Sequence, residues 1–523
     1  MDSSSISIPV PGEGKEWRVD VPMRSFQGGY YPQLIALYKH LGVQFRKTNY
    51  SYSFALLSPE LHSKERRITT SMIYNGRSGL AGVSMPSSMR RRTKDTPVLL
   101  GTLQMIWSFA AFALMAVQLL VCYLRLLILA VPIFRFLDTP TMAYSTWARR
   151  TLPTGLIARM TGFDLAWIEF TQDVVIPLFS AVCTCPLDDV QSHPVEEFLD
   201  YIWLTLGTHH YAAKNGVCDV VSRLSSSIPE SNIHLSSPIF SLRADPSNPS
   251  VASIHCETPI GEKTYSGFHH IIFATQANRA VPILESYANS LPQTSEQHHP
   301  QHHHSIHRQI DCLRKFKYIP SLVINHTDGS LLPDDPQDRR DLNLISPDPT
   351  SFPSHFQAHE TEAEMNYDSN SPSRNRIRCL PPVYTMATHS LTPPSGFPSH
   401  LPPIYQTTNP IAAPKEKRIL SVSTLERAVV TMESKQVLHE LHLEPEKRAW
   451  QCAGQAKSEL GPIQGAGKLQ SSGNDVDERP GIWLCGSYAC SGIPLLEGCV
   501  VSAKNVVEQG IWESEGVKRR VSW

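Results

Sequence analysis

Glycine and charged residues are scarce in this sequence. It has 28 glycines among 523 residues, where average usage would give roughly 37. Charged residues make up 18%, against a typical figure of about 25%. The glycine deficit argues against a complete nucleotide-binding enzyme, whose phosphate loop needs several glycines. The 41% of hydrophobic residues is enough for a core, which excludes a wholly disordered chain, a collagen and a coiled coil.

Net charge and paired cysteines are also lacking. With 47 Lys and Arg against 48 Asp and Glu, the net charge is −1, so no basic field exists to gather nucleic acid. The 11 cysteines are an odd number, and Cys183 and Cys185 are too close together for a CxxC clamp. We therefore expect free thiols in a reducing, intracellular compartment and no metal site. Met1 to Gly14 is polar, without the apolar stretch of a secretory signal.

One long run of the chain has no charge at all. Val98 to Leu124 is apolar and uncharged over 27 residues, more than the roughly 20 that a membrane-spanning helix needs. Four basic residues lie just before it: Arg90, Arg91, Arg92 and Lys94. A very hydrophobic buried helix is one interpretation. A membrane-associated segment is the interpretation we favour.

Elsewhere the periodicity is that of a mixed α/β protein. Helices are expected at Tyr31 to Leu41, Pro194 to Leu206 and Gly216 to Leu224. Strands are expected at Trp17 to Met23, Ile233 to Leu235, Pro238 to Arg243, Val251 to Glu257 and His269 to Ala274. Three segments are expected to lack regular structure: the histidine cluster His298 to His307, as a solvated loop rather than a metal site, the Pro- and Ser-rich stretch Ser346 to Pro403, and Gln455 to Asp477.

The most informative segment lies near the C-terminus, between Gly481 and Gly510. It predicts a short strand, Ile482 to Cys485, then a turn at Gly486 and a helix that begins near Pro494. A strand, a glycine turn and a helix N-terminus together present unpaired N–H groups that suit an anion such as a pyrophosphate. The alternative is a plain strand-turn-helix packing unit.

This segment resembles the C-terminal flavin-binding motif of the flavin-containing amine oxidase superfamily. The matching residues are Gly486, Ser487, Gly492, Glu497, Gly498 and Ser502. The resemblance implies FAD as cofactor, with its pyrophosphate or ribityl chain near Gly486 and Ser487. It also implies that the isoalloxazine ring lies at the helix start, beside Pro494, Leu495 and Leu496.

Further stretches are similar to family segments in the same order. These are Phe26 to Val43, His209 to Leu224, Ile233 to Arg243 and His269 to Asn278. In the third, the resemblance places the backbone of Ile239 against the adenine. In the fourth, it places Ala274 and Thr275 near the cofactor, where a strand returns to the nucleotide-binding sheet.

The sequence departs from the family at the phosphate loop. The family begins with a strand, a GxGxxG turn and a helix, and no such unit occurs here. Gly465-Ala466-Gly467 has neither a strand before it nor the third glycine. We therefore expect an amine-oxidase-like two-domain α/β fold with an incomplete nucleotide-binding domain, plus a hydrophobic helical segment. Either the chain is truncated or tight FAD binding has been lost.

A second departure concerns the substrate. The family's amine oxidases place an aromatic residue just before the final Glu-Gly pair, where this chain has Leu495 and Leu496. Tyr488 is the nearest aromatic residue, and the sequence does not favour its facing the flavin. An apolar or lipid-like substrate is therefore expected rather than an amine. No catalytic acid or base can be named, and His209 and His210 are interpreted as structural.

The sequence divides into five expected segments. Residues 1–90 begin the oxidoreductase fold, 91–140 form the membrane or cap segment, and 141–330 hold substrate- and FAD-binding stretches. Residues 331–415 form a Pro- and Ser-rich insert, and 416–515 complete the FAD site.

Three functions stay open. The favoured one is a membrane-associated, FAD-dependent oxidoreductase that takes a small apolar substrate and contacts membrane lipid. The others are a flavin-free remnant of the fold that acts as a membrane-associated interaction protein, and an unrelated membrane protein. Since one crossing would separate two parts of a single fold, the open options are two crossings, a helix that enters one leaflet and a buried cap helix. We favour a monotopic insertion or a hairpin.

Overall fold

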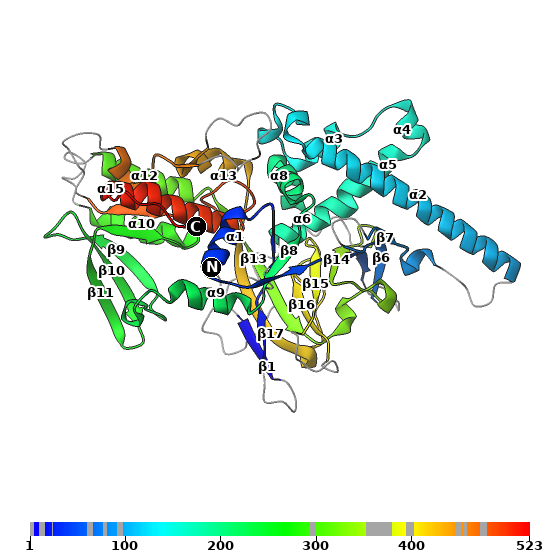
Figure 1. Ribbon diagram of the computed structural model, residues 1–523, viewed down its shortest axis with the longest axis horizontal. Coiled ribbons are helices and arrows are strands. Elements are labelled where there is room, and N and C mark those ends of the chain that lie inside the picture. The colour runs from blue at the N-terminus through cyan, green and yellow to red at the C-terminus, as the bar shows by residue number, and fades with distance from the viewer. Residues whose placement is uncertain are drawn as a thin grey trace.

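The computed structural model (Figure 1) describes most of the chain. The described residues are 5–9, 16–22, 25–59, 66–76, 81–90, 98–291, 300–351, 379–393, 402–444, 452, 458–470 and 479–523.

An eight-stranded sheet with the order β17-β13-β16-β15-β14-β5-β6-β7 forms the largest part of the fold. Its strands are β5 Tyr52–Ser58, β6 Arg67–Tyr74, β7 Val83–Ser84, β13 Lys317–His326, β14 Leu342–Pro347, β15 Met386–Leu391, β16 Ile404–Thr408 and β17 Ile419–Val429. Neighbours pair antiparallel except β14 and β5, which pair parallel. The sheet thus combines strands from both halves of the chain.

Helices from the middle of the chain cover one face of this sheet. They are α3 Tyr144–Arg150, α5 Phe163–Glu169, the π-helical turn η5 Phe170–Val175, α6 Ile176–Cys183, α7 Leu187–Ser192 and α8 Val195–Thr205, while the exposed α4 Leu156–Met160 packs on α5 away from the sheet. Between them the rings of Phe179 and Phe198 stack with centroids 3.9 Å apart. Trp147 and Trp167 are also fully buried here. Aromatic burial of this extent stabilises the layer of helices on the sheet.

A second region is built around two parallel strands, β12 His270–Phe273 and β20 Gly481–Leu484. The helices α10 Ala277–Ser290, α12 Pro300–Leu313, α14 Leu496–Asn505 and α15 Trp512–Ser514 belong to it, as does the antiparallel sheet of β9 Ile239–Ala244, β10 Ala252–Thr258 and β11 Gly261–Phe268. Among the described residues the parallel sheet has only these two strands. A small parallel sheet is what we expect of an incomplete nucleotide-binding domain.

A third, small sheet connects the two regions. It has the order β3-β8-β4, with β3 Phe26–Gln27, β4 Phe45–Thr48 and β8 His210–Ala213. It packs with α1 Pro32–His40 and α9 Gly216–Ser225. The hairpin of β1 Ser5–Pro9 and β2 Glu16–Asp20 lies beside it. Three short elements come after β17 in the chain: α13 Met432–Val437 and the paired strands β18 His442–Leu443 and β19 Glu459–Leu460. The predicted helices 31–41, 194–206 and 216–224 are confirmed as α1, α8 and α9.

The uncharged run forms one long helix, α2 Val98–Ala130, whose N-terminal part projects from the body of the protein (Figure 1). That part exposes apolar side chains in all directions, Trp107 at 77% among them. The C-terminal part is packed, with Cys122, Leu126 and Ala130 buried. Two helical stretches are long and apolar enough to cross a membrane, Gly101–Ala130 and Phe163–Cys183. Within the apolar 18-residue part of each stretch, 11% of the first and 50% of the second is buried inside the protein.

Several predicted elements are wrong. Ile233 to Leu235 forms no strand. Residues 300–307 of the histidine cluster are not a loop but begin α12, where buried His302 bonds to the Tyr287 hydroxyl and the Ala466 carbonyl oxygen, while 298–299 lie outside the described residues. Its polar composition hid a helix that is anchored by tertiary hydrogen bonds.

The segments expected to be irregular are partly ordered as well. The stretch from Ser346 to Pro403 contains the end of β14 and all of β15, while 352–378 and 394–401 lie outside the described residues. The stretch from Gln455 to Asp477 contains β19 and the 3-10 helix η12 Gln464–Gln470. Both pack against strands that are distant in sequence, which local composition does not reveal.

Candidate functional site

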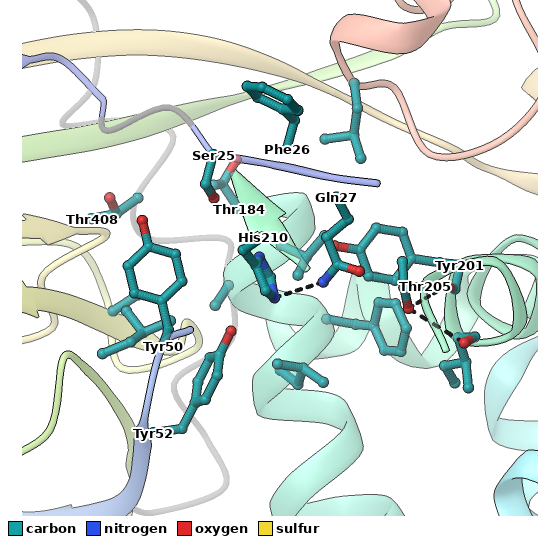
Figure 2. Close-up of a pocket in the computed structure, with 18 of the residues that line it drawn as sticks. Ser25, Phe26, Gln27, Tyr50, Tyr52, Thr184, Tyr201, Thr205, His210 and Thr408 are labelled. Carbon is teal, nitrogen blue, oxygen red and sulfur yellow. Dashed lines mark hydrogen bonds between the residues drawn. The ribbon is translucent and has the colours of Figure 1, made fainter. Parts of the chain in front are cut away.

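A cavity of about 990 Å³ lies between the large sheet, the β20–α14 connection and α2. Its size is at the upper end for sites that bind small molecules or cofactors. Figure 2 shows part of its lining, where Tyr50 and Tyr52 face His210 and Gln27 across the space.

Seven of the eight predicted cofactor residues line this cavity. They are Ala274, Thr275, Gly486, Ser487, Pro494, Leu495 and Leu496. The first two follow β12 and the next two follow β20. Because β12 and β20 are parallel and in register from His270–Gly481 to Phe273–Leu484, their carboxyl ends meet at one edge, which is where open α/β sheets bind ligands.

The eighth predicted residue lies elsewhere. Ile239, at the start of β9, is 46% exposed and does not line the cavity. The resemblance placed its backbone against an adenine, and that contact stays a prediction.

Local hydrogen bonds hold the turn between β20 and α14. The Ser502 hydroxyl lies 3.0 Å from the Gly486 N–H and 3.1 Å from its carbonyl oxygen. A side chain on Gly486 would meet the Tyr488 ring at 2.9 Å, and the φ of +152° there favours glycine. The turn therefore requires glycine both for its backbone conformation and for the approach of Tyr488.

The Glu497 carboxylate connects α14 to α1. It accepts hydrogen bonds from the backbone N–H groups of Gln33 and Leu34, both at 2.9 Å. Burial raises the pKa of Glu497 to about 7, although these two bonds act to lower it. The residue that matches the family's glutamate thus caps a helix in this chain.

Tyr488 lines the cavity, and the expectation that its ring does not face a flavin stays a prediction. It also borders a second cavity of about 20 Å³, together with Glu197. The Tyr488 hydroxyl and one Glu197 oxygen are buried without a hydrogen-bond partner among the described residues. A volume above roughly 10–15 Å³ is large enough for one water molecule.

The residues present fit one end of FAD better than the other. The planar ring end suits the apolar wall of Pro494, Leu495 and Leu496. Phosphates are commonly bound by helix N-termini, but Glu497 occupies the N-terminus of α1. The Asp20 carboxylate occupies that of α9, accepting from Val217 N–H at 3.0 and 3.1 Å.

Positive charge for a pyrophosphate is also scarce. Among the lining residues that the structure describes, Arg427 is the one with a permanent positive charge, and its Nε donates to the Thr184 hydroxyl at 3.1 Å. Gly465 packs on the Trp483 ring, which agrees with the prediction that Gly465-Ala466-Gly467 is no phosphate loop. The N-terminus of α14, which no side chain caps, is thus the described helix end at the cavity that stays open to a pyrophosphate.

The polar part of the lining was not predicted from the sequence. Tyr50, Tyr52 and Tyr201 line the cavity together with His210 and His389. Burial lowers the pKa of both His210 and His389 to about 4, so both are neutral at pH 7. The alternation of Tyr50, Tyr52 and Phe54 was the available signal, since residues two apart share one face of a strand.

Helix α2 forms part of the cavity wall. The residues involved are Ala116, Leu119, Leu120, Tyr123 and Leu126. Two of them, Leu120 and Tyr123, are 56% and 38% exposed.

The sequence matches no protein-family model and no curated protein. Among solved structures, the chain is similar over 98% of its length to cyclohexylamine oxidase from Brevibacterium oxydans IH-35A, with a TM-score of 0.42, 9% identity and 91% of that chain covered. Wild-type putrescine oxidase bound to putrescine is similar over 97% of the chain, with a TM-score of 0.39, 12% identity and 90% covered. A CLA-producing fatty acid isomerase from P. acnes is similar over 96%, with a TM-score of 0.43, 10% identity and 88% covered.

Proposed function

We propose that this protein is a membrane-associated, flavin-dependent oxidoreductase that acts on an apolar, lipid-like molecule. The observation that supports this proposal is the convergence of seven predicted flavin residues with the wall of α2 on a single cavity. A bound flavin would supply hydride transfer, and the protein would supply position and an apolar pocket. Pro494, Leu495 and Leu496 would hold the ring and exclude water from it.

The surface of α2 supports membrane association. An exposed helix that is apolar on all sides is unfavourable in water and favourable in hydrocarbon. Arg90, at the end of the preceding described segment, is held to the body by bonds to Gln337 and the Met85 carbonyl oxygen. The eight peptide steps from Arg90 to Val98 reach at most about 29 Å, which is no more than the roughly 30 Å of hydrocarbon.

A complete crossing would therefore need a fully extended return strand with unpaired backbone groups in lipid, which is highly unfavourable. We infer that α2 enters one leaflet, so that Leu120 and Tyr123 open the cavity to lipid. Alkaline carbonate extraction of membranes tests this inference. A protein that is released fully, without detergent, would contradict it.

A second candidate function is a flavin-free protein that binds an apolar molecule. Two observations favour this candidate, because each disfavours binding of the pyrophosphate of FAD. Carboxylates occupy the N-termini of α1 and α9, and few cations line the cavity.

Absorbance spectra and flavin titrations of the full chain in detergent separate the two candidates. Flavin bands in the purified protein, or saturable quenching of riboflavin fluorescence, support the oxidoreductase. Because no lysine and only Arg427 among the described lining residues could pair with the pyrophosphate, riboflavin is expected to bind about as tightly as FAD. A Gly486→Val variant should lose flavin binding, while Gly155→Ala, in open space, should retain it. A folded protein that binds none of these flavins would support the second candidate.

A further inference from the structure

Four large apolar side chains are exposed on α4 and at the start of α5, and we call them the α4 patch. They are Leu156, Ile157, Met160 and Leu165, with exposed fractions of 74%, 79%, 79% and 62%. Leu156 and Met160 are four residues apart, so they lie on one face of the helix. A single exposed apolar residue is ordinary on a protein surface, but a cluster of this kind marks a contact with a partner or a membrane.

The α4 patch lies next to the projecting part of α2. Figure 1 shows α4 and α5 beside this helix. In the turn that follows α4, the Thr161 carbonyl oxygen accepts from the Gln118 side chain of α2 at 3.5 Å. Leu114 and Val121, one turn to either side of Gln118, are 59% and 43% exposed. The exposed apolar surfaces of α2 and α4 are therefore neighbours.

Unpaired positive charge accompanies the α4 patch. The stretch from the last two residues of α3 to the start of α5 has three arginines and one carboxylate. Arg150 is paired with Asp138 at 2.7 Å, and the carboxylate, Asp164, accepts from a backbone N–H of its own helix at 2.9 Å. Arg149 and Arg159 are exposed and form no ion pair with any residue that the structure describes.

Negative charge appears only further along the chain. Glu169 is one turn beyond Leu165 and interacts electrostatically with Asp173. An anionic surface is therefore expected to meet the α4 patch and to stop before this acidic pair.

The surface of a lipid leaflet matches both properties of the patch. At that surface apolar side chains enter the acyl region, while long arginine side chains reach the phosphate groups. Arg91, Arg92 and Lys94 precede α2 in the sequence. Positive charge thus lies near both ends of the projecting part of α2, and both ends are expected at the level of the head groups.

A second copy of the chain fits the patch less well. In a twofold dimer each patch would meet its own copy. The unpaired Arg149 and Arg159 would then face the same two arginines of the other copy, and like charges across an interface lower the affinity. A lipid phosphate has the opposite sign.

We propose that the α4 patch, with Arg149 and Arg159, is a second membrane contact that binds the phosphate groups of an anionic leaflet, and that α2 lies along this leaflet. The inference rests on the membrane association in the proposed function and adds its lipid partner and the orientation of α2.

Flotation with vesicles tests the proposal. The full chain, diluted from detergent, is mixed with vesicles of phosphatidylcholine alone, or of phosphatidylcholine with roughly one third phosphatidylserine. The unaltered chain should bind both and prefer the anionic vesicles at least tenfold. Arg149→Gln combined with Arg159→Gln should lower the affinity for anionic vesicles by about 5- to 25-fold, up to about fivefold for each charge, and leave binding to neutral vesicles unchanged.

A second variant tests the apolar part of the contact. Leu156→Asp combined with Ile157→Asp should weaken binding to both kinds of vesicle at least tenfold, because two side chains no longer enter the acyl region. All four altered residues are exposed, so folding is expected to be unchanged. The comparison of the two vesicles with the unaltered chain does not depend on any variant.

Each variant has a matched control elsewhere on the surface. Arg519→Gln combined with Arg520→Gln removes the same charge near the C-terminus, away from α4 (Figure 1). Leu235→Asp combined with Ile260→Asp alters two apolar residues outside the patch that are 79% and 95% exposed. Both controls should bind as the unaltered chain does.

The outcomes separate this proposal from the proposed function. Equal binding to both vesicles, or unchanged binding of the two α4 variants, would overturn the proposal and leave α2 as the anchor. A dimer in detergent that these variants dissociate would show a second copy in place of lipid and also overturn it. If the unaltered chain binds no vesicles, membrane association fails together with the proposal, and flavin absorbance in the same preparation reports separately on the oxidoreductase.

Discussion

At the scale of the residue, Glu497 connects pH to stability. Its pKa of about 7 in the folded protein lies above the ordinary value of 4.5, so between these values the folded state binds the proton more tightly than the unfolded state. Stability therefore falls as pH rises from about 5 to 7, with a slope of up to about 1.4 kcal/mol per pH unit, and then levels off. Urea unfolding across this range measures the slope.

Glu497→Gln provides the comparison, because glutamine does not titrate. The variant should lack this part of the pH dependence, because its amide neither gains nor loses a proton in this range. A variant with the same slope as the unaltered chain would contradict the role of Glu497.

The fully buried Trp483 makes Gly465 indispensable. Gly465 has a φ of +71°, and a Cβ there would lie 2.7 Å from the Trp483 ring. Gly465→Ala should therefore lower the free energy of unfolding by about 2–4 kcal/mol, which combines backbone strain with overpacking. Gly516→Ala separates the two effects, because Gly516 has a similar φ of +67° and no neighbour within 4 Å. It should cost only about 1–2 kcal/mol.

At the scale of the element, α2 is expected to determine membrane binding. Trp107→Asp combined with Phe109→Asp places two charges on its projecting part, at a cost of about 2.5–3.5 kcal/mol each near a bilayer centre. Sedimentation with anionic liposomes should show at least a tenfold loss of bound protein. Ile260→Asp is the control, because Ile260 is 95% exposed in the turn between β10 and β11, and that variant should bind normally. Unchanged binding of the double variant would exclude α2 as the anchor.

At the scale of the whole molecule, low net charge and the exposed helix act together. A net charge of −1 gives little electrostatic repulsion near neutral pH, while α2 offers a large apolar surface for self-association. Sedimentation velocity at pH 7 should show oligomers without detergent and monomers in detergent. The Trp107→Asp, Phe109→Asp variant should stay monomeric in both conditions. A monomeric unaltered chain without detergent would contradict this expectation.

Elements with strong local periodicity were predictable, and those fixed by distant contacts were not. The helices α1, α8 and α9 follow from apolar spacing and from Pro or Gly at their ends. Helix α12 begins with polar histidines, and its position depends on the bonds of His302 to Tyr287 and Ala466. Likewise β15 lies in a Pro- and Ser-rich stretch and becomes a strand by pairing with β14 and β16.

By itself the sequence determined the apolar helix, the strand-turn-helix at Gly486 and the scarcity of phosphate-binding glycines, because each depends on residues that are close together in the chain. Tertiary structure alone decided that Ala274 and Gly486 meet at one edge, because that requires β12 and β20 to pair in parallel. It also decided that Tyr52 and His389 share a face of the cavity, because cross-strand register joins positions more than 300 residues apart.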